Sequence, residues 1–378
     1  MLSASTTRLG ADRRVGVERL ARRRSRRTPF MRHEYLAALH DSGSATARPA
    51  GALFATVQRG GGCSRRTALP EDAFLRRVRL RLGLGRRLPA PRPGYYPKLL
   101  GAVPFTPVPG ARLLARRARA PAAAAPCARS RGSTSCRRRT CCFSPTPTAR
   151  RPRAGRLDAA RRRAVPLAER GRAPYPDFAA FLAGLQRDKR KKIQQERRRV
   201  AEAGITFEIP RGRGHHGGAL GLLLPLLHPH LPGAPLHPYL TRDFFARMAA
   251  TMARHWCCSS PAAAAERVAC SLIGVDPDRR VAYGRYWGAV EHVPCLHFEA
   301  CYYQPLQWCI AQGYRRFEGG AQGEHKMARG LLPVPTHSAH WLAHPQFARA
   351  VADFLEREGD GVEHYLDELE RAQPVQAV

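Results

Sequence analysis

Apolar positions first follow a regular pattern near residue 175. Four of them have the i, i+3, i+4, i+7 spacing of an amphipathic helix: Phe178, Phe181, Leu182 and Leu185. The helix runs into a basic stretch at residues 189–199, and we expect it to end at Gly204, since glycine favours the position just past a helix C-terminus. The basic stretch has two interpretations, a solvated helix face or a surface for the phosphates of a ligand.

Alternation of apolar and polar residues predicts strands. One strand is expected at residues 205–209, one from Val281 to Trp287 with both faces substantially occupied, and a short one at residues 315–318 that opens into Gly319.

Helices are expected around these strands. An apolar stripe from Phe298 to Ile310 predicts a helix closed by Gly313, in which Pro305 marks either a kink or the first turn. Two amphipathic helices are expected at residues 347–355 and 362–369. This order predicts an α/β (α+β) fold, a mixed sheet flanked by helices.

The positive charge of the chain lies almost entirely in its first half. Residues 1–172 carry 40 basic and 8 acidic side chains, whereas residues 173–378 carry 24 and 21. Residues 1–28 and 117–172 are rich in Arg and poor in apolar periodicity, so we expect a disordered basic tail and a disordered segment. Such a basic half could bind nucleic acid non-specifically, which is an alternative function of a different class.

The composition argues against a metal centre and a membrane anchor. The 11 cysteines form no CxxC pair, and five histidines from His215 to His237 are irregularly spaced, so we expect no metal site and reduced thiols. The longest apolar stretch, residues 217–227, is too short to span a bilayer. We therefore expect a cytoplasmic protein.

Ionisable and aromatic side chains concentrate between residues 285 and 330. The glycines around Gln322 would let backbone N–H groups approach a ligand closely. Lys326 and Arg329 are suited to phosphate or carboxylate, Arg329 in a bidentate manner. The residues alone thus indicate an anionic-ligand site with a candidate base.

Four groups of residues in this half resemble one known family. They are Tyr283 to Gly288 (YGRYWG), Leu296 to Glu299 with Cys301 to Gln304 (LHFE, CYYQ), Glu318 to Lys326 with Ala328 to Gly330 (EGGAQGEHK, ARG), and Ser338 to Trp341 (SAHW). As a set they resemble the bacterial N-acyltransferases related to the peptidoglycan-bridge (Fem-type) aminoacyltransferases of the GNAT superfamily. Blocks elsewhere extend the resemblance to somewhat over half of the chain.

The resemblance implies two GNAT-like halves joined around the basic helix. It also implies transfer of an acyl or aminoacyl group from a carrier, acyl-CoA or aminoacyl-tRNA, to an amine acceptor, with no tightly bound cofactor. A helix N-terminus near residues 294–297 would receive a phosphate of the carrier.

Roles are assigned to site residues on the same resemblance. The candidate base is Glu318 or His325, and the candidate donor to the oxyanion is Tyr303 or Tyr286. Binding roles are expected for Arg285, His297, Glu299, Gln322, Glu324, Lys326 and Arg329. Structural roles compete with some of these, because His297 could be a hydrogen-bonded core histidine and Glu299 could pair with Arg285.

Family-like blocks alternate abruptly with segments made of Arg, Ala, Pro, Gly and Cys. We interpret these segments as frameshifted translation of a GC-rich gene; the alternative is a genuine basic insertion. The expected organisation is a partial N-terminal half at residues 29–116 and a C-terminal domain at residues 173–378, with aberrant segments at 211–236 and 255–280. The last segment would then replace strands that should precede Val281, leaving the sheet incomplete.

Overall fold

The computed structural model describes most of the second half of the chain and separate pieces of the first half. The described backbone comprises residues 3–6, 28–45, 53–59, 62–70, 99–101, 103–106, 108, 113–115, 140–143, 157–166, 175–209, 240–264, 266–321 and 324–341, with 349, 353 and 357. Side chains are described at residues 28–45, 103–106, 108, 175–209, 240–264, 266–320, 326–332, 349, 353 and 357.

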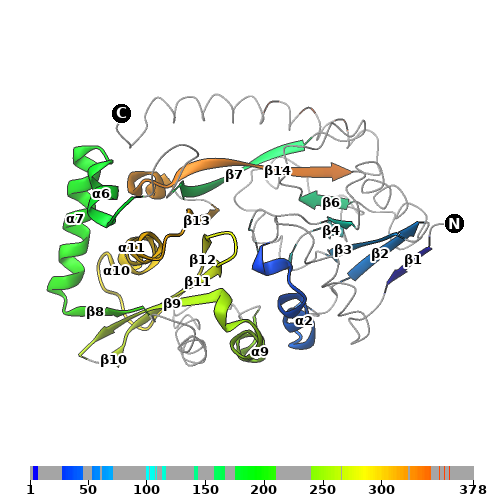
Figure 1. Cartoon of the computed structure of the whole chain (residues 1–378), viewed down its shortest axis with the longest axis horizontal. Coiled ribbons are helices and arrows are strands. Elements are labelled where there is room, and N and C mark those ends of the chain that lie inside the picture. Colours follow the sequence, from blue (N-terminus) through cyan, green and yellow to red (C-terminus); the bar gives the residue numbers. More distant parts are fainter. Residues whose placement is uncertain are drawn as a thin grey trace, which may run out of the picture. The chain divides into compact units, whose positions relative to one another are not determined.

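The chain divides into two compact units. Unit 1 comprises residues 1–160 and 336–365, and unit 2 comprises residues 161–335 and 366–378 (Figure 1). We expected the boundary near residue 173, whereas residues 161–172 belong to unit 2 and residues 336–365 cluster with unit 1.

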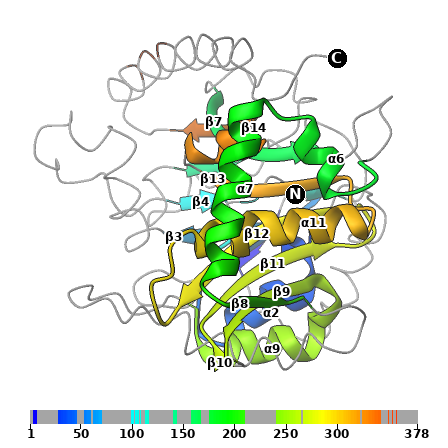
Figure 2. The same cartoon turned by 90° about the vertical axis from the view of Figure 1, so that its left-hand side faces the viewer.

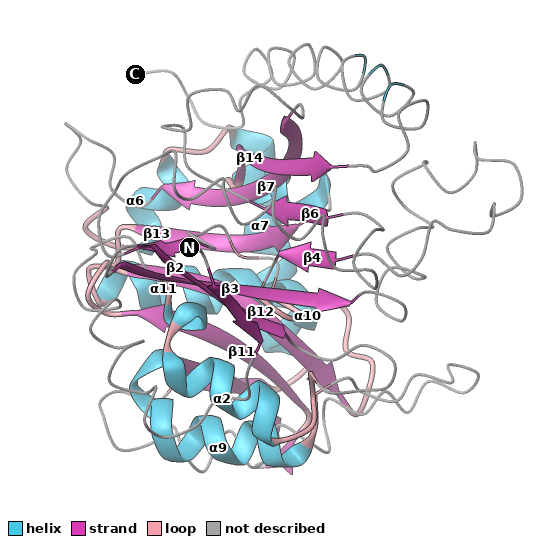
Figure 3. Cartoon of the chain, turned by 90° about the vertical axis from the view of Figure 1, so that its right-hand side faces the viewer, coloured by secondary structure: helices cyan, strands magenta, loops and turns pink. Residues whose placement is uncertain are grey.

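The described residues of unit 1 form a mixed set of strands and one α-helix. Its strands follow the order β1 (Ser3–Thr6), β2 (Leu53–Arg59), β3 (Gly62–Pro70), β4 (Leu99–Gly101), β6 (Thr140–Phe143) and β14 (Leu332–Trp341), and β5 (Leu113–Ala115) pairs with β3. The pair β4 and β6 is parallel, and β2 and β3 form the long antiparallel pair visible in Figure 3.

Helix α2 (His33–Asp41) carries the described core of unit 1. The turn η2 (Pro29–Met31) precedes it, and the helix buries Tyr35 and Leu39 completely. The Tyr35 hydroxyl lies 2.8 Å from Thr106 Oγ1, so the buried phenol is satisfied within the unit.

Two expectations of disorder are wrong for part of their range. Strand β1 falls in the basic tail, and strands β6 and β7 (Leu157–Pro166) fall within residues 117–172. Each strand pairs its backbone with a neighbouring strand, namely β2, β14 and β13 (Arg316–Ala321). Strand pairing therefore overrides a composition that by itself indicates no structure.

Unit 2 is built on a mixed sheet. Its strand order is β7, β13, β12 (Val281–Ala289), β11 (Ala269–Asp276), β9 (Trp256–Ala263) and β10 (Glu266–Arg267), and β8 (Ile205–Glu208) also pairs with β9. The pair β12 and β13 is parallel, whereas the other pairs of this unit are antiparallel. The sheet with its helices confirms the predicted fold class.

The expectation that residues 255–280 lack strands is wrong. This segment forms β9, β10 and β11, and β11 pairs with β12 along its whole length. Nearly every residue of β9 and β11 is buried. Strands covered on both faces show no alternation of apolar and polar residues, so the pattern gave no strand signal here.

The predicted helix after residue 175 is present as two helices. Helix α6 (Phe178–Ala183) begins at Asp177, whose side chain accepts a hydrogen bond from the Ala180 N–H at 2.7 Å. Helix α7 (Arg187–Glu202) follows after Gly184 and ends before Gly204, where φ is +70° as predicted for a residue past a helix end. Figure 2 shows α7 passing across α11 (Gln304–Ala311).

The helix predicted around Phe298 is continuous but changes its winding. It consists of α10 (Leu296–Phe298), a π-helical turn η5 (Glu299–Tyr303) and α11. The turn lies directly before Pro305, which lacks an N–H and would clash with a carbonyl of a regular preceding turn. Pro305 therefore stands in the first turn of α11, one of the two expected alternatives.

The main core of unit 2 lies between this helix, α6, α7 and the sheet. Fully buried members include Tyr303, Leu306, Cys309 and Phe317. Helix α9 (Arg242–Met252), capped by Thr241, buries Phe244 and Met248. The predicted helices at residues 347–369 lie outside the described residues, apart from the exposed Arg349, Asp353 and Arg357.

Candidate functional site

The site is built where the parallel strands β12 and β13 stop pairing. Their register runs from Val281 opposite Arg316 to Tyr283 opposite Glu318, although β12 continues to Ala289 and β13 to Ala321. A Cβ atom on Gly284 would lie 3.6 Å from the Glu318 carbonyl oxygen, so the two backbones remain close at this point. Beyond Tyr283 and Glu318, the peptide groups of β12 and β13 no longer pair with each other.

Glu318 lies at the end of this paired stretch. Its side chain is buried, and its Oε1 atom lies 3.2 Å from Arg316 Nη2. Burial and the nearby Glu318 carboxylate both raise the pKa of Tyr283, the residue opposite. The strand predicted at residues 315–318 is present, and it extends beyond Glu318 to include Gly319 and Gly320.

Lys326 is buried beside the same strand. It stands in the short helical segment η6 (Glu324–Arg329), and its Nζ atom donates a hydrogen bond to the Gly319 carbonyl at 2.7 Å. A Cβ atom on Gly319 would lie 2.2 Å from Leu331 Cδ2, so only glycine fits here without a shift of its neighbours. The lysine ammonium is thus held at Gly319, the residue that follows Glu318 in the sequence.

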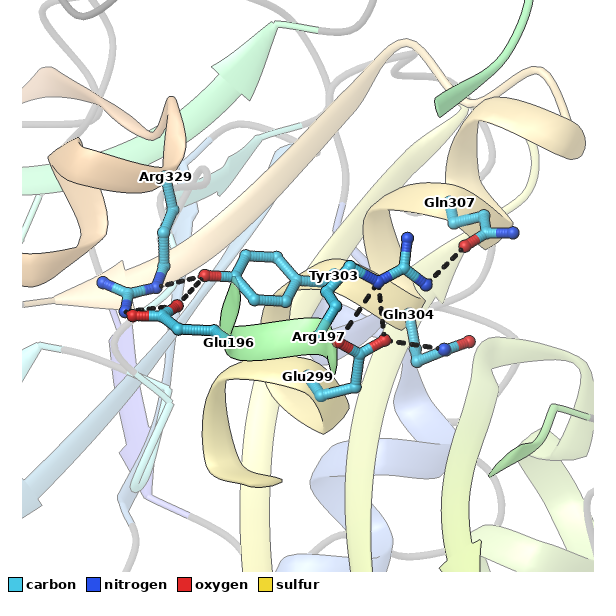
Figure 4. Close-up of polar contacts among 7 residues, drawn as sticks. All are labelled: Glu196, Arg197, Glu299, Tyr303, Gln304, Gln307 and Arg329. Carbon is cyan, nitrogen blue, oxygen red and sulfur yellow. Dashed lines mark hydrogen bonds and ion pairs between the residues drawn. The ribbon is translucent and has the colours of Figure 1, made fainter. Parts of the chain in front are cut away.

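Arg329 forms a buried cluster at the end of η6 (Figure 4). Its Nη2 atom lies 2.7 and 2.8 Å from the two carboxylate oxygens of Glu196, and its Nε atom donates to the Tyr303 hydroxyl at 2.8 Å. The guanidinium carbon lies 3.5 Å from the ring centroid of Phe298. We expected Arg329 to bind a ligand anion, but the carboxylate it binds here belongs to helix α7.

Tyr303 completes the cluster by donating its hydroxyl hydrogen to Glu196. Burial is the largest cause that raises the pKa of this phenol, and the hydrogen bond to Glu196 adds to it. The phenol therefore keeps its proton, and that proton is directed to Glu196 rather than to a ligand.

Glu299 makes a second buried ion pair, and its partner is not Arg285. Arg197 Nε lies 3.1 Å from Glu299 Oε1, and Gln304 donates to the same oxygen at 2.8 Å. Burial raises the pKa of Glu299, while Arg197 opposes that effect. Arg285 instead lies over the Tyr286 ring and donates to its hydroxyl at 3.1 Å. The alternative that Glu299 pairs with Arg285 across the fold is therefore wrong.

His297 has an aromatic environment. Its ring makes edge contacts with the rings of Trp287, Phe298 and Tyr302, at centroid distances of 5.4, 5.6 and 5.7 Å. Tyr286 is half-buried on β12, with its ring edge against Phe245. These contacts place His297 in the aromatic packing at α10 and Tyr286 against Phe245 of helix α9.

The side chains of the remaining candidates are not described. Gln322 is not described, and Glu324 and His325 are described by their helical backbone alone. Among the described residues, no group of three His, Cys, Asp or Glu side chains is arranged to hold a metal ion.

Sequence reasoning missed Glu196. Its position carries a signal: Glu196 stands three residues after Ile193 and four before Val200, the two residues of α7 that are 1 % exposed. A carboxylate within the apolar stripe of an otherwise basic helix indicates a buried partner.

The chain matches the model of one protein family over most of its length. Residues 91–377 match the FemAB-like family, described as peptidoglycan biosynthesis/recognition. The chain therefore belongs to this family, as the motifs at residues 283–341 indicated. No curated protein matches the chain in sequence.

Solved structures of the same fold include FemX, which is 8 % identical, with a TM-score of 0.51 over 89 % of this chain and 97 % of that one. The chain also resembles a tandem GNAT protein from the clavulanic acid biosynthesis pathway (15 % identity, TM-score 0.41, 91 % and 99 % covered). A third is L-PGS from Bacillus licheniformis (11 % identity, TM-score 0.47, 90 % and 96 % covered). The likeness to FemX agrees with the GNAT-like fold expected from the motifs.

Two further expectations concern membranes and nucleic acid. No helix within the described ranges has the length and apolarity needed to cross a bilayer. The family gives no support to the alternative of a nucleic-acid-binding protein.

Proposed function

We propose that this protein is an N-acyltransferase that moves an acyl or aminoacyl group from a carrier to an amine in cell-envelope synthesis. The observation that carries the proposal is the end of the β12–β13 pairing at Tyr283 and Glu318, in a chain of the FemAB-like family. Two parallel strands that stop pairing offer backbone N–H and C=O groups to an extended, amide-containing carrier arm.

The reaction needs few groups. The amine nitrogen attacks the carbonyl carbon of a thioester or ester, so a C–N bond forms while a C–S or C–O bond breaks. A base must take the proton of the ammonium, and a donor must stabilise the tetrahedral oxyanion. The proton finally leaves with the thiol or hydroxyl of the carrier.

Glu318 is the described residue we assign as base. It lies where the strands part, and its ion pair with Arg316 keeps a carboxylate in a buried position. Lys326 places a buried positive charge at the Gly319 carbonyl, one residue after Glu318. Tyr286 is the better oxyanion donor, because the proton of Tyr303 is directed to Glu196.

The donor is acyl-CoA or aminoacyl-tRNA, and the acceptor is an amine of a peptidoglycan precursor. The test incubates the protein with each donor in turn and with a lysine-containing muropeptide, and follows product mass and donor release. A panel of acetyl-, succinyl- and long-chain acyl-CoA is compared with charged tRNA. Transfer from one donor class identifies the carrier.

Two variants test the assigned residues. Glu318→Gln keeps the shape of the side chain but cannot accept the proton, so kcat should fall by about 10²–10⁴-fold. Glu291→Gln changes an exposed glutamate near the end of β12 and serves as the matched control. Equal activity of the two variants would refute the assignment of Glu318.

A further inference from the structure

Helix α7 presents a charged residue to the interior of unit 2. Its inward face carries Ile193 and Val200, with Glu196 between them at 6 % exposure. Taking a carboxylate out of water is costly, and it is tolerated when the partner geometry is good and the remaining lone pairs accept hydrogen bonds. Both oxygens of Glu196 meet this condition through Arg329 and Tyr303.

The contacts of Arg329 fix its guanidinium in a single plane. Glu196 holds the Nη2 atom and the Tyr303 hydroxyl holds Nε (Figure 4). The Phe298 ring lies against the face of the group. These partners come from α7, η5 and α10, so one side chain joins three helical segments to η6. We name Glu196, Tyr303 and Arg329 the clasp.

A second ion pair, Arg197 with Glu299, also connects α7 to the π-helical turn η5. Arg197 binds Glu299, the first residue of η5, while Glu196 binds Tyr303, its last residue. The irregular turn is therefore tied at both ends to one rigid helix.

The clasp also determines where Lys326 lies. Lys326 and Arg329 are three residues apart in η6, a spacing that places both side chains on one side of a 3₁₀ turn. The turn closes with hydrogen bonds from the Gly330 and Leu331 N–H groups to the Met327 and Lys326 carbonyls. A shift of Arg329 would move Lys326 away from the Gly319 carbonyl next to Glu318.

We propose that Glu196 is a positioning residue: through Arg329 and Tyr303 it holds the η6 segment so that Lys326 stays on the Gly319 carbonyl, one residue after Glu318. The inference rests on the proposed function and names a residue that acts through others rather than on the substrate. Stability alone does not explain a buried ion pair, because apolar residues of similar size in its place often give an equal or higher free energy of unfolding.

This contrast gives the test. The double variant Glu196→Leu/Arg329→Met replaces the charged pair by apolar side chains of similar size, so no unpaired charge remains inside. The matched control, Glu202→Leu/Arg199→Met, makes the same changes on exposed positions of α7. Urea denaturation, kcat and KM are measured for the wild type and both doubles.

If the clasp positions the site, the inner double folds with a urea midpoint close to that of the control, while its kcat falls by about 10–100-fold and KM for the donor changes little. An inner double with wild-type kcat would overturn the inference. If the inner double is unfolded, Tyr303→Phe, which keeps the ion pair, replaces it in the same comparison.

Hydrogen exchange separates this inference from the proposed function. If the wild type transfers no group from any donor, the proposed function fails, but amide exchange can still be measured. The clasp predicts faster exchange in residues 324–331 of the folded inner variant than in the wild type, with β9 and β11 unchanged. Unchanged exchange in residues 324–331 would refute the clasp whether or not the protein is active.

Discussion

Arg329 reaches both carboxylate oxygens of Glu196 with one nitrogen, at 2.7 and 2.8 Å, and both side chains are almost fully buried. The two residues lie 133 positions apart in the chain. This pair joins the basic helix α7 to η6, the segment that carries Lys326. Helix α7 supplies none of the residues assigned to catalysis, but the pair connects it to the proposed site.

Removing one partner of this pair should be far more harmful than removing a surface charge. Arg329→Met leaves the Glu196 carboxylate buried without its cation, so we expect the free energy of unfolding to fall by about 3–5 kcal/mol. Arg198→Met, on the exposed face of the same helix, should change it by less than about 0.5 kcal/mol. Urea denaturation of both variants measures the difference, and equal effects would contradict the buried pairing.

Glu299 should make stability depend on pH in a defined direction. Burial raises its pKa above the ordinary 4.5, so the folded protein binds this proton more tightly than the unfolded chain. The stabilisation that this raised pKa provides is greatest below pH 4.5, and it is lost as the pH rises through the pKa of Glu299 in the folded protein. The stability of the wild type relative to Glu299→Gln should therefore fall over this window.

Denaturation curves from pH 4 to pH 7 test the direction. Glu202→Gln is the control, because it alters an exposed glutamate of α7. If the free energy of unfolding of the wild type instead rises relative to that of Glu299→Gln as the pH increases, the ion pair with Arg197 outweighs the effect of burial.

Gly330 is expected to be intolerant of alanine. Its φ is +77°, and a Cβ atom would lie 3.1 Å from Phe181 Cζ and 3.2 Å from Leu185 Cδ2. Gly313 has a similar φ of +67° but meets nothing within 4 Å. Gly313→Ala should cost about 1–2 kcal/mol for the left-handed backbone, and Gly330→Ala about 1–3 kcal/mol more for the crowding.

Thermal and urea unfolding of the two alanine variants isolate the crowding, since the backbone strain is common to both. Equal losses of stability in the two variants would mean that Phe181 and Leu185 do not crowd a side chain at residue 330.

Frameshifted segments remain a prediction that DNA sequencing can test. Reading codons 40–285 in all three frames should reveal aromatic-rich, strand- or helix-patterned sequence across residues 117–172 and 211–236. Because residues 256–276 pair as strands in the present frame, most of that segment should keep its frame. Absence of any such alternative sequence would favour a genuine basic insertion.

The sequence predicted the elements whose pattern has a clear period. Helix α7 with its end at Gly204, strand β8 and strand β12 lie where the periodicity placed them. Strands β9 and β11 were missed because burial on both faces removes the alternation, and Cys, Ser and Ala fill them.

The roles assigned to site residues stay predictions, whereas the structure gives the partners of several of these residues. The resemblance drew attention to Tyr303, and the concentration of charged and aromatic residues to Lys326 and Arg329. Neither could show that Arg329 meets Glu196 or that Glu299 meets Arg197, since both contacts span more than 100 residues. Long-range pairs of this kind follow from how the helices pack, which no local pattern encodes.

The measurement that tests the central claim most directly is group transfer by the wild-type protein. A donor with an isotopically labelled acyl or aminoacyl group is incubated with an amine acceptor, and the label is followed by mass spectrometry. The account predicts a labelled amide, formed in equal amount with released carrier, at a rate that Glu318→Gln lowers and Glu291→Gln does not. Release of carrier without amide formation, or no reaction with either class of donor, would contradict it.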